Sequence, residues 1–192
     1  MNQATISHPL FQQLVKEQST IIDLLAQLDL CENNDDLKKL SLNLQTFAEI
    51  QHHEKEERLL FTTIYQNQKI HEGGPMCSLY FDLHQFENRK VKVEQIIGRT
   101  IKHTHQQAML LKNRTPLVIP IEEHQSGRDL LAYILEKVDH TAFAINKINL
   151  ELYKNIQVNH IKKEANCLYH MCAGLLSKDT ADEILAEWIK DT

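Results

Sequence analysis

Two stretches of this chain repeat one pattern of histidine, glutamate and apolar residues. Residues 52–61 (HHEKEERLLF) align with residues 160–169 (HIKKEANCLY), and both read H-x-x-K-E-x-x-x-L-[FY]. Upstream, Glu17-Gln18 precedes Asp23-Leu24-Leu25-Ala26 at the same offset at which Glu123-His124 precedes Asp129-Leu130-Leu131-Ala132. The spacing from Gln18 to His52 is 34 residues, and that from His124 to His160 is 36. An internal repeat predicts two copies of one structural unit, related here by a pseudo-twofold axis.

Each unit is expected to be a helical hairpin. Only 5 Gly and 4 Pro occur among 192 residues, and apolar residues recur every three or four positions, which favours helix. Long helices are predicted at about 7–29, 35–67, 120–138 and 141–177. His-Glu-Gly-Gly-Pro at 71–75 breaks the second pattern, and residues 76–115 are read as an inserted helical segment. A short amphipathic helix at about 180–191 is expected to pack on the outside.

The apolar stripe of each helix marks the side that is expected to face the core. The four stripes are Phe11, Leu14, Ile21, Leu25 and Leu28; Leu37, Leu40, Leu44, Ala48, Leu59 and Thr63; Ile121, Leu131, Leu135 and Val138; and Ile145, Ile148, Leu152, Ile156, Met171 and Leu175. His52 and Glu56 fall on the second stripe, and His160 and Glu164 fall on the fourth. Both His-x-x-x-Glu pairs are therefore predicted to point inward.

An inward His-x-x-x-Glu pair suits a metal ion. Residues four apart lie one above the other on a helix, about 5–6 Å apart at Cβ, so imidazole and carboxylate can reach one centre. A single such pair is usually a solvated surface pair. A carboxylate in an apolar core needs a cation or a proton, however, and here Glu56 and Glu164 are both predicted to be inside. Imidazole and carboxylate without thiolate suit iron, manganese or zinc.

The motifs resemble those of the hemerythrin-like (HHE cation-binding) family. The stretch His52-His53-x-x-Glu56-Glu57-x-x-Leu60-Phe61 is similar to its second-helix signature, and Glu123-His124-x-x-Gly127-Arg128 and His160-Ile161-x-Lys163-Glu164 are similar to its third- and fourth-helix elements. The resemblance implies one all-α domain over residues 1–192, an up-down-up-down four-helix bundle with the insert between helices two and three. It also implies terminal ligands at His52, His124 and His160, bridging carboxylates at Glu56 and Glu164, and two iron ions. His53 and Glu57 would be neighbours that do not contact the metal.

The chain departs from the family pattern in two ways. Gln18 stands where the first helix of the family carries a histidine, and the insert 76–115 has no counterpart. Gln18 could coordinate through its amide oxygen or leave one iron short of a ligand. His84, inside the insert, is the candidate for a substitute ligand.

The function that this resemblance implies is binding or sensing of a small oxidant, such as dioxygen or nitric oxide, at non-haem iron. Redox activity, including repair of iron centres, belongs to the same set of expectations. The alternative is a metal-binding module without turnover, used for metal storage or for regulation of a partner. A ferritin-like oxidase ranks lower because only Glu49-x-x-His52 fits its pattern. A metal-free scaffold would leave Glu56 and Glu164 unexplained.

The charge and the cysteines limit which partners and which cell compartment are expected. The net charge is -5 and no dense basic patch occurs, which argues against a nucleic-acid partner. No apolar run approaches the roughly 20 residues that span a membrane. The four cysteines form no CxxC pair, so reduced thiols and a cytoplasmic location are expected. A homodimer is the open alternative to a monomer.

Overall fold

The computed structural model describes residues 7–66, 83–112 and 116–190. In these ranges the chain forms helices joined by short turns and contains no strand, which confirms the all-α prediction. The predicted breaker at 71–75 lies outside the described residues, as do the ends of the insert at 76–82 and 113–115. None of the described helices combines the length and the apolar character that crossing a membrane requires.

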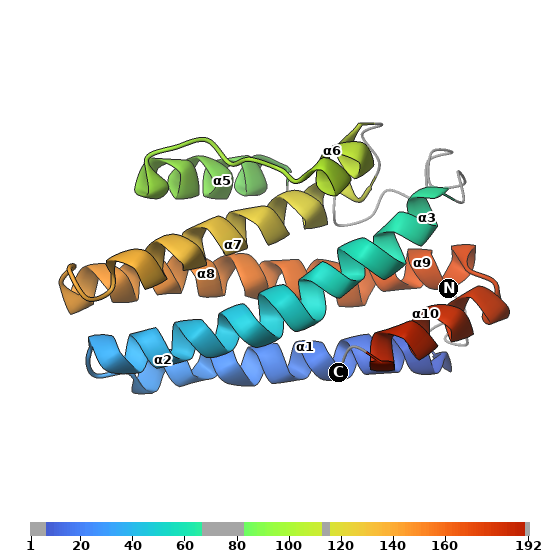
Figure 1. Ribbon diagram of the computed structural model, residues 1–192, viewed down its shortest axis with the longest axis horizontal. Helices are drawn as coiled ribbons and strands as arrows, with labels where there is room; N and C mark the ends of the chain where they lie inside the picture. The colour runs from blue at the N-terminus through green and yellow to red at the C-terminus, as the bar shows by residue number, and fades with distance from the viewer. Residues whose placement is uncertain (1–6, 67–82, 113–115, 191–192) are drawn as a thin grey trace.

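Long helical rods run side by side along the molecule (Figure 1). They are α1 (Pro9–Ala26) with the 3-10 turn η2 (Gln27–Leu30); α2 (Asn34–Leu44) with η3 (Gln45–His53), η4 (Glu56–Phe61) and α3 (Thr62–Gln66); α7 (Val118–Lys137); and α8 (Phe143–Lys163) with η6 (Glu164–Leu168) and α9 (Tyr169–Leu175). The second rod begins where predicted, since the Asn33 side chain accepts a hydrogen bond from the Asp36 backbone N–H at 3.0 Å. Helix α7 packs along α8, and α2 contacts both.

The apolar core is divided into two clusters with a polar layer between them. On α1, Leu14 belongs to one cluster and Ile21 to the other, while Glu17 and Gln18 lie buried between. The other rods follow the same order, with polar layers formed by His52, His53 and Glu56; by Glu123 and His124; and by His160 and Glu164. Buried charged groups are thus gathered in one band across the rods.

The predicted apolar stripes are correct on the first helix and shifted on the later rods. All five stripe residues of α1 and η2 are buried. On the second rod Leu60, Phe61 and Ile64 are buried in place of Leu59 and Thr63, and beyond Glu164 the buried residues are Leu168, Tyr169 and Cys172 in place of Met171 and Leu175. The segments η3, η4 and η6 are π-helical, with i→i+5 hydrogen bonds, so the 3.6-residue period does not carry through them.

The first half of α8 also presents a different face from the predicted one. Ile145 and Ile148 are 52% and 67% exposed, whereas Asn146 is buried. The Asn146 amide donates hydrogen bonds to the carbonyls of Val138 and Thr141, at 3.2 Å and 3.1 Å. These bonds tie the α7–α8 turn together, and they set the rotation of α8 against the apolar pattern.

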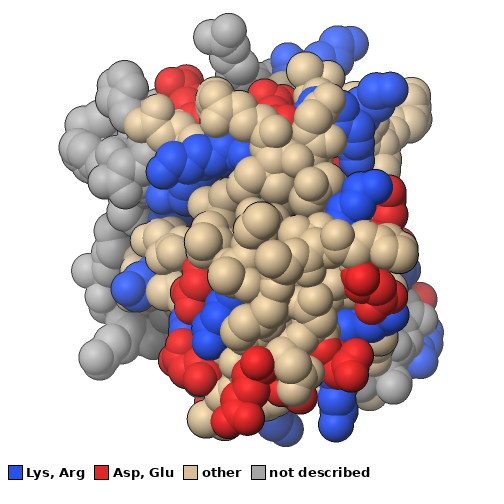
Figure 2. All heavy atoms as spheres, turned by 90° about the vertical axis from the view of Figure 1, so that its left-hand side faces the viewer, with Lys and Arg blue, Asp and Glu red and all other residues tan. Residues whose placement is uncertain are grey.

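Two further elements cover the rods. The insert contains α5 (Leu83–Ile97), which lies along α7, and α6 (His105–Leu111), near the start of α7 (Figure 1). Helix α10 (Lys178–Lys190) packs against α1 and η4. Its Trp188 is fully buried, so the apolar face of this outer helix reaches the core. Figure 2 shows one end of the molecule, where basic and acidic side chains alternate around an uncharged centre.

Candidate metal centre

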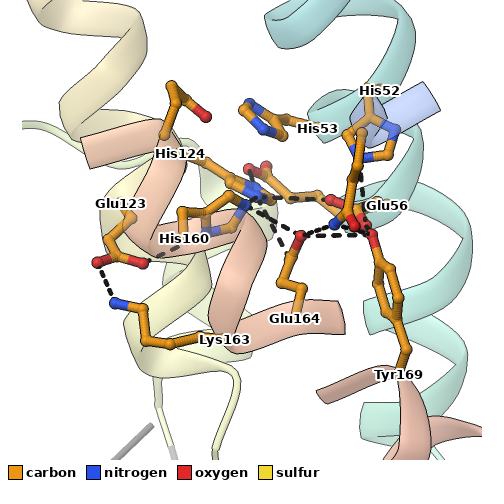
Figure 3. A network of polar contacts seen from close by, with 12 residues as sticks. His52, His53, Glu56, Glu123, His124, His160, Lys163, Glu164 and Tyr169 are labelled. Carbon is orange, nitrogen blue, oxygen red and sulfur yellow. Dashed lines mark hydrogen bonds and ion pairs between the residues drawn. The ribbon is translucent and has the colours of Figure 1, made fainter. Parts of the chain in front are cut away.

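The polar layer holds a compact cluster of inward-pointing imidazoles and carboxylates (Figure 3). Ligand atoms of Glu56, His124, His160 and Glu164 all lie within 4.8 Å of one another, and these four residues are buried. Nε2 of His124 lies 2.9 Å from Nε2 of His160 and 3.5 Å from Oε2 of Glu56. Nε2 of His52 lies 3.7 Å from Oε1 of Glu56. The five predicted ligands therefore meet in one place.

Each buried histidine of the cluster turns its second nitrogen, Nδ1, to its own carboxylate. The pairs are His52 with Glu17 at 2.9 Å, His53 with Glu49 at 3.0 Å, His124 with Glu57 at 2.9 Å and His160 with Glu123 at 3.3 Å. A carboxylate at Nδ1 fixes the ring and favours the tautomer that leaves Nε2 free to bind a metal. This pairing is typical of metal-binding histidines. The sequence motifs do not reveal all four pairs.

The outer carboxylates are in turn held by the covering elements. Trp188 of α10 donates its Nε1–H to Glu17 at 2.8 Å. Gln107 of α6 donates to Glu57 at 3.1 Å, and Arg89 of α5 donates to Glu123 at 3.2 Å. Lys163 also donates to Glu123 (Figure 3). The insert and the C-terminal helix thus complete the centre, although nothing in their sequence predicted it.

Several buried atoms that face the centre have no hydrogen-bond partner among the described residues. They are Gln18 Oε1, His52 Nε2, His53 Nε2, Glu56 Oε2 and Glu164 Oε1. A buried polar atom without a partner costs about 1–3 kcal/mol, and such atoms are rare in folded proteins. Five of them around one point fit a metal ion, because a cation would satisfy all of them at once. The residues present therefore suit a metal of the iron, manganese or zinc class.

His53 belongs to this cluster, although the family resemblance placed it outside. Its ligand nitrogen lies within 4.8 Å of those of His124 and His160. The His53 ring stacks on the His124 ring, with centroids 4.1 Å apart. The signal that could have identified His53 is the pair Glu49-x-x-x-His53, which places a carboxylate one helical turn before the ring.

Gln18 and Tyr169 close the cluster on the opposite side. The Tyr169 hydroxyl donates to Oε1 of Glu56 at 2.6 Å. The Gln18 amide donates to Oε2 of Glu164 at 2.9 Å and to the Tyr169 hydroxyl at 2.7 Å. Gln18 therefore contacts the cluster through its amide nitrogen, while its Oε1, the atom that could coordinate a metal, is buried without a hydrogen-bond partner. The side chain of His84, the other candidate, lies outside the described residues.

The ligand residues lie on or next to the π-helical segments. His52 and His53 end η3, Glu56 begins η4, and Glu164 begins η6. A π-turn widens the helix locally and is found frequently at functional sites. Both copies of the His-x-x-x-Glu motif carry one, which supports a common role for the two copies.

The electrostatics of the cluster favour protonation of Glu56 and His160, two of the groups that a cation would bind. Burial, together with the charge of Glu164, raises the pKa of Glu56 to about 8. Burial opposes the protonation of His160, but the carboxylates of Glu164 and Glu123 outweigh it and raise its pKa to about 10. Burial and the neighbouring imidazoles hold the pKa of His124 well below its usual range. Protonated His160 can therefore donate from Nε2 to neutral His124.

Gly127→Ala is expected to destabilise the protein by about 1–3 kcal/mol, because overpacking a filled core strains its neighbours. A Cβ at Gly127 would lie 2.8 Å from Nε2 of Gln157 and 3.1 Å from Oε1 of Glu49. Gly174→Ala is the matched control, since its Cβ would meet nothing within 4 Å and should stabilise α9 slightly. Urea unfolding of both variants checks the difference. Equal stability of the two would contradict it.

None of the cysteines in the described residues forms part of the cluster. Cys31 and Cys172 are free and buried. Cys167 is disulfide-bonded, so the prediction of reduced thiols is wrong for this residue. The sequence holds no CxxC spacing that would mark Cys167 for a disulfide, which is why this bond could not be predicted.

Comparison of the chain with models of known protein families, with curated proteins and with solved structures found no match. The assignment of the centre therefore rests on its own geometry. The resemblance of the motifs to the hemerythrin-like family stays a prediction.

Proposed function

We propose that this chain is a hemerythrin-like protein that holds two iron ions and binds or senses a small oxidant such as dioxygen or nitric oxide. The observation that carries the proposal is the set of five inward-facing buried atoms without hydrogen-bond partners. They lie between two apolar clusters that would exclude water from a bound ion. Orientation of four imidazoles by four separate carboxylates supports the same conclusion.

The arrangement of the rods supports the four-helix bundle that the family resemblance implies. Short connections join η2 to α2 and α7 to α8, so that consecutive rods run in opposite directions (Figure 1). Each hairpin contributes one His-x-x-x-Glu motif, from the η3–η4 and α8–η6 segments. The ligands then come from facing helices, as in other bundles with carboxylate metal sites.

The two central carboxylates are placed to bridge two ions. Glu56 directs Oε1 towards Nε2 of His52, at 3.7 Å, and Oε2 towards Nε2 of His124, at 3.5 Å. Glu164 has Oε1 at 3.9 Å from Nε2 of His124, and its Oε2 accepts a hydrogen bond from the Gln18 amide at 2.9 Å. A carboxylate with one oxygen on each side of the layer suits an ion on each side.

Iron bound here would supply a redox-active centre to which a small diatomic molecule can bind directly. The residues of the chain would position and insulate it. Gln18 contributes no imidazole, so an ion on its side would have fewer strong ligands than an ion on the opposite side. The buried apolar side chains above and below the layer limit the access of water.

Anaerobic loading with ferrous iron tests the proposal. We expect about two iron ions per chain by elemental analysis. After oxidation, two coupled ferric ions should give no electron paramagnetic resonance signal, whereas a lone ferric ion gives one. Addition of dioxygen or nitric oxide to the ferrous protein should change its optical spectrum. Absence of bound iron, or iron without any spectral response to either molecule, would refute the proposal.

A metal-binding module without turnover is the second candidate. The contacts of Arg89 and Gln107 with Glu123 and Glu57 favour it, because they link the insert to the centre and could pass its state to a partner. Iron-loaded protein that steadily consumes peroxide or nitric oxide would exclude this alternative. Tight metal binding with no consumption would favour it.

Metal loading at pH 7 is expected to release at least about two protons per chain, because Glu56 and His160 are both protonated at that pH in the metal-free protein, and burial of His52 is outweighed by the Glu56 carboxylate, which raises the pKa of His52 as well. The apparent affinity should therefore rise with pH, by about tenfold per pH unit for each proton released. A pH indicator in weakly buffered solution measures the release. Glu56→Gln should release about one proton fewer. Loading without proton release would contradict the protonation states given above.

A further inference from the structure

The two copies of the repeat differ at three positions in the polar layer. Gln18 corresponds to His124, Ile161 corresponds to His53, and Tyr169 corresponds to Phe61. Together these differences place His53 and His124 on one side of the layer, and Gln18 and Tyr169 on the other side. One side of the layer gains nitrogen ligands, and the other side gains an amide and a phenol.

The imidazole-rich side is formed by His53, His124 and His160. Their ligand nitrogens lie within 4.8 Å of one another. The Phe61 ring stacks on the His124 ring, with centroids 5.7 Å apart and planes 13° apart, and it offers no polar atom. An ion on this side would therefore be bound by nitrogen, and by oxygen only from Glu56 and Glu164.

The oxygen-rich side is formed by Gln18, Tyr169 and His52. The Tyr169 hydroxyl lies 2.6 Å from Oε1 of Glu56, the same oxygen that faces Nε2 of His52. Oε1 of Gln18 is buried without a hydrogen-bond partner, although the Gln18 Nε2 donates to Tyr169 and Glu164. An ion on this side would meet one imidazole nitrogen and otherwise oxygen.

The outer residues follow the same asymmetry. Glu49 orients His53, and the corresponding residue in the other copy is Gln157, whose amide donates to Glu49 at 3.2 Å. Glu57 orients His124, and the residue corresponding to Glu57 is Ala165. Where the inner histidine is missing, its orienting carboxylate is missing too. The two sides therefore differ both in the inner residues and in the carboxylates that orient them.

We infer that the two metal positions are inequivalent and that the centre binds iron on the imidazole-rich side and manganese on the oxygen-rich side. Imidazole ligands suit iron, whereas carboxylate, carbonyl and hydroxyl oxygens suit the harder manganese(II) ion. Glu56 and Glu164 would be shared by the two ions. This inference rests on the proposed two-metal centre and departs from it in one metal, because manganese takes the oxygen-rich position when both metals are available.

The test is competitive loading of the full-length metal-free protein with equimolar iron(II) and manganese(II) under anaerobic conditions. Anomalous diffraction on either side of the iron and manganese absorption edges then locates each metal in the crystal. We expect iron beside His53, His124 and His160, and manganese beside Gln18 and Tyr169. The manganese-to-iron ratio should be at least about tenfold higher on the oxygen-rich side.

Gln18→His combined with Tyr169→Phe supplies the decisive variant, because it reverses two of the three differences and gives the oxygen-rich side the counterparts of His124 and Phe61. Iron should then occupy both positions. Gln12→His, on the exposed face of α1, is the control and should leave the distribution unchanged. Equal metal ratios at the two positions in the wild-type protein would overturn the inference but leave the two-metal proposal intact. Failure to bind either metal would overturn both.

Discussion

Replacement of Glu56 and Glu164 together by glutamine is expected to reduce the iron content from about two ions per chain to a trace. Both carboxylates are fully buried, and they are the only anionic groups in the central cluster of four potential ligands. Glutamine preserves their size but carries no charge, so the imidazoles alone would have to hold two cations. Elemental analysis after anaerobic loading and desalting measures the loss.

Glu136→Gln is the control for this experiment. Glu136 is exposed on α7, with its side chain 68% accessible, so its removal should not change the iron content. Retention of more than about half of the iron by the double variant would show that the histidines dominate binding, and would refute the central role of the two carboxylates.

The stability of the metal-free protein should increase when Glu56 is replaced by glutamine, even though the same replacement weakens metal binding. The pKa of Glu56 is raised from 4.5 to about 8, so the unfolded chain loses this proton at lower pH than the folded chain. Stability is therefore lost as the pH rises from about 4.5 to about 8. Glu56→Gln should increase the free energy of unfolding by about 1–4 kcal/mol at pH 8 and by much less at pH 4. A variant that is less stable at pH 8 would contradict this explanation.

Trp188→Ala is expected to destabilise the protein by about 3–5 kcal/mol, the usual cost of removing a large aromatic side chain from a core. Trp188 is fully buried in the cluster that joins α10 to α1 and η4. Its loss would also remove the Nε1–H that holds Glu17, the carboxylate that orients His52. The metal affinity should therefore fall as well.

Trp188→Phe separates the two effects, because it keeps most of the aromatic packing and loses only the hydrogen bond. We expect most of the stability to return while the metal affinity remains weakened. Trp188 is the single tryptophan of the chain, so unfolding must be followed by circular dichroism. A loss below about 1 kcal/mol for Trp188→Ala would show that α10 is not part of the core.

The sequence was sufficient to predict the helical fold class and a buried group of histidines and glutamates that includes Glu56, His124, His160 and Glu164. The repeat located His52 with Glu56 and His160 with Glu164, because i,i+4 geometry on an apolar stripe is a local property. His124 followed from the resemblance of its motif. These predictions depend only on residues that are near one another in the chain.

Features that depend on distant contacts could not be predicted. Trp188, Gln107 and Arg89 reach the outer carboxylates from elements whose own patterns show only amphipathic helices. The rotation of the helices beyond Glu56 and Glu164 was also missed, since the π-turns change the period that the stripes assume. The repeat includes Tyr169 as its variable last position, but only the structure shows that the Tyr169 hydroxyl accepts a hydrogen bond from Gln18.

If the unpartnered atoms in the polar layer bind metal as proposed, the lifetime of this protein depends on its supply of metal. A ligand that binds only the folded chain adds about 4 kcal/mol of stability when its concentration is a thousand times its dissociation constant. Single domains are stable by only about 5–15 kcal/mol, and cellular proteases remove the unfolded fraction. Starvation for metal would thus lower the abundance of the chain without any change in its synthesis.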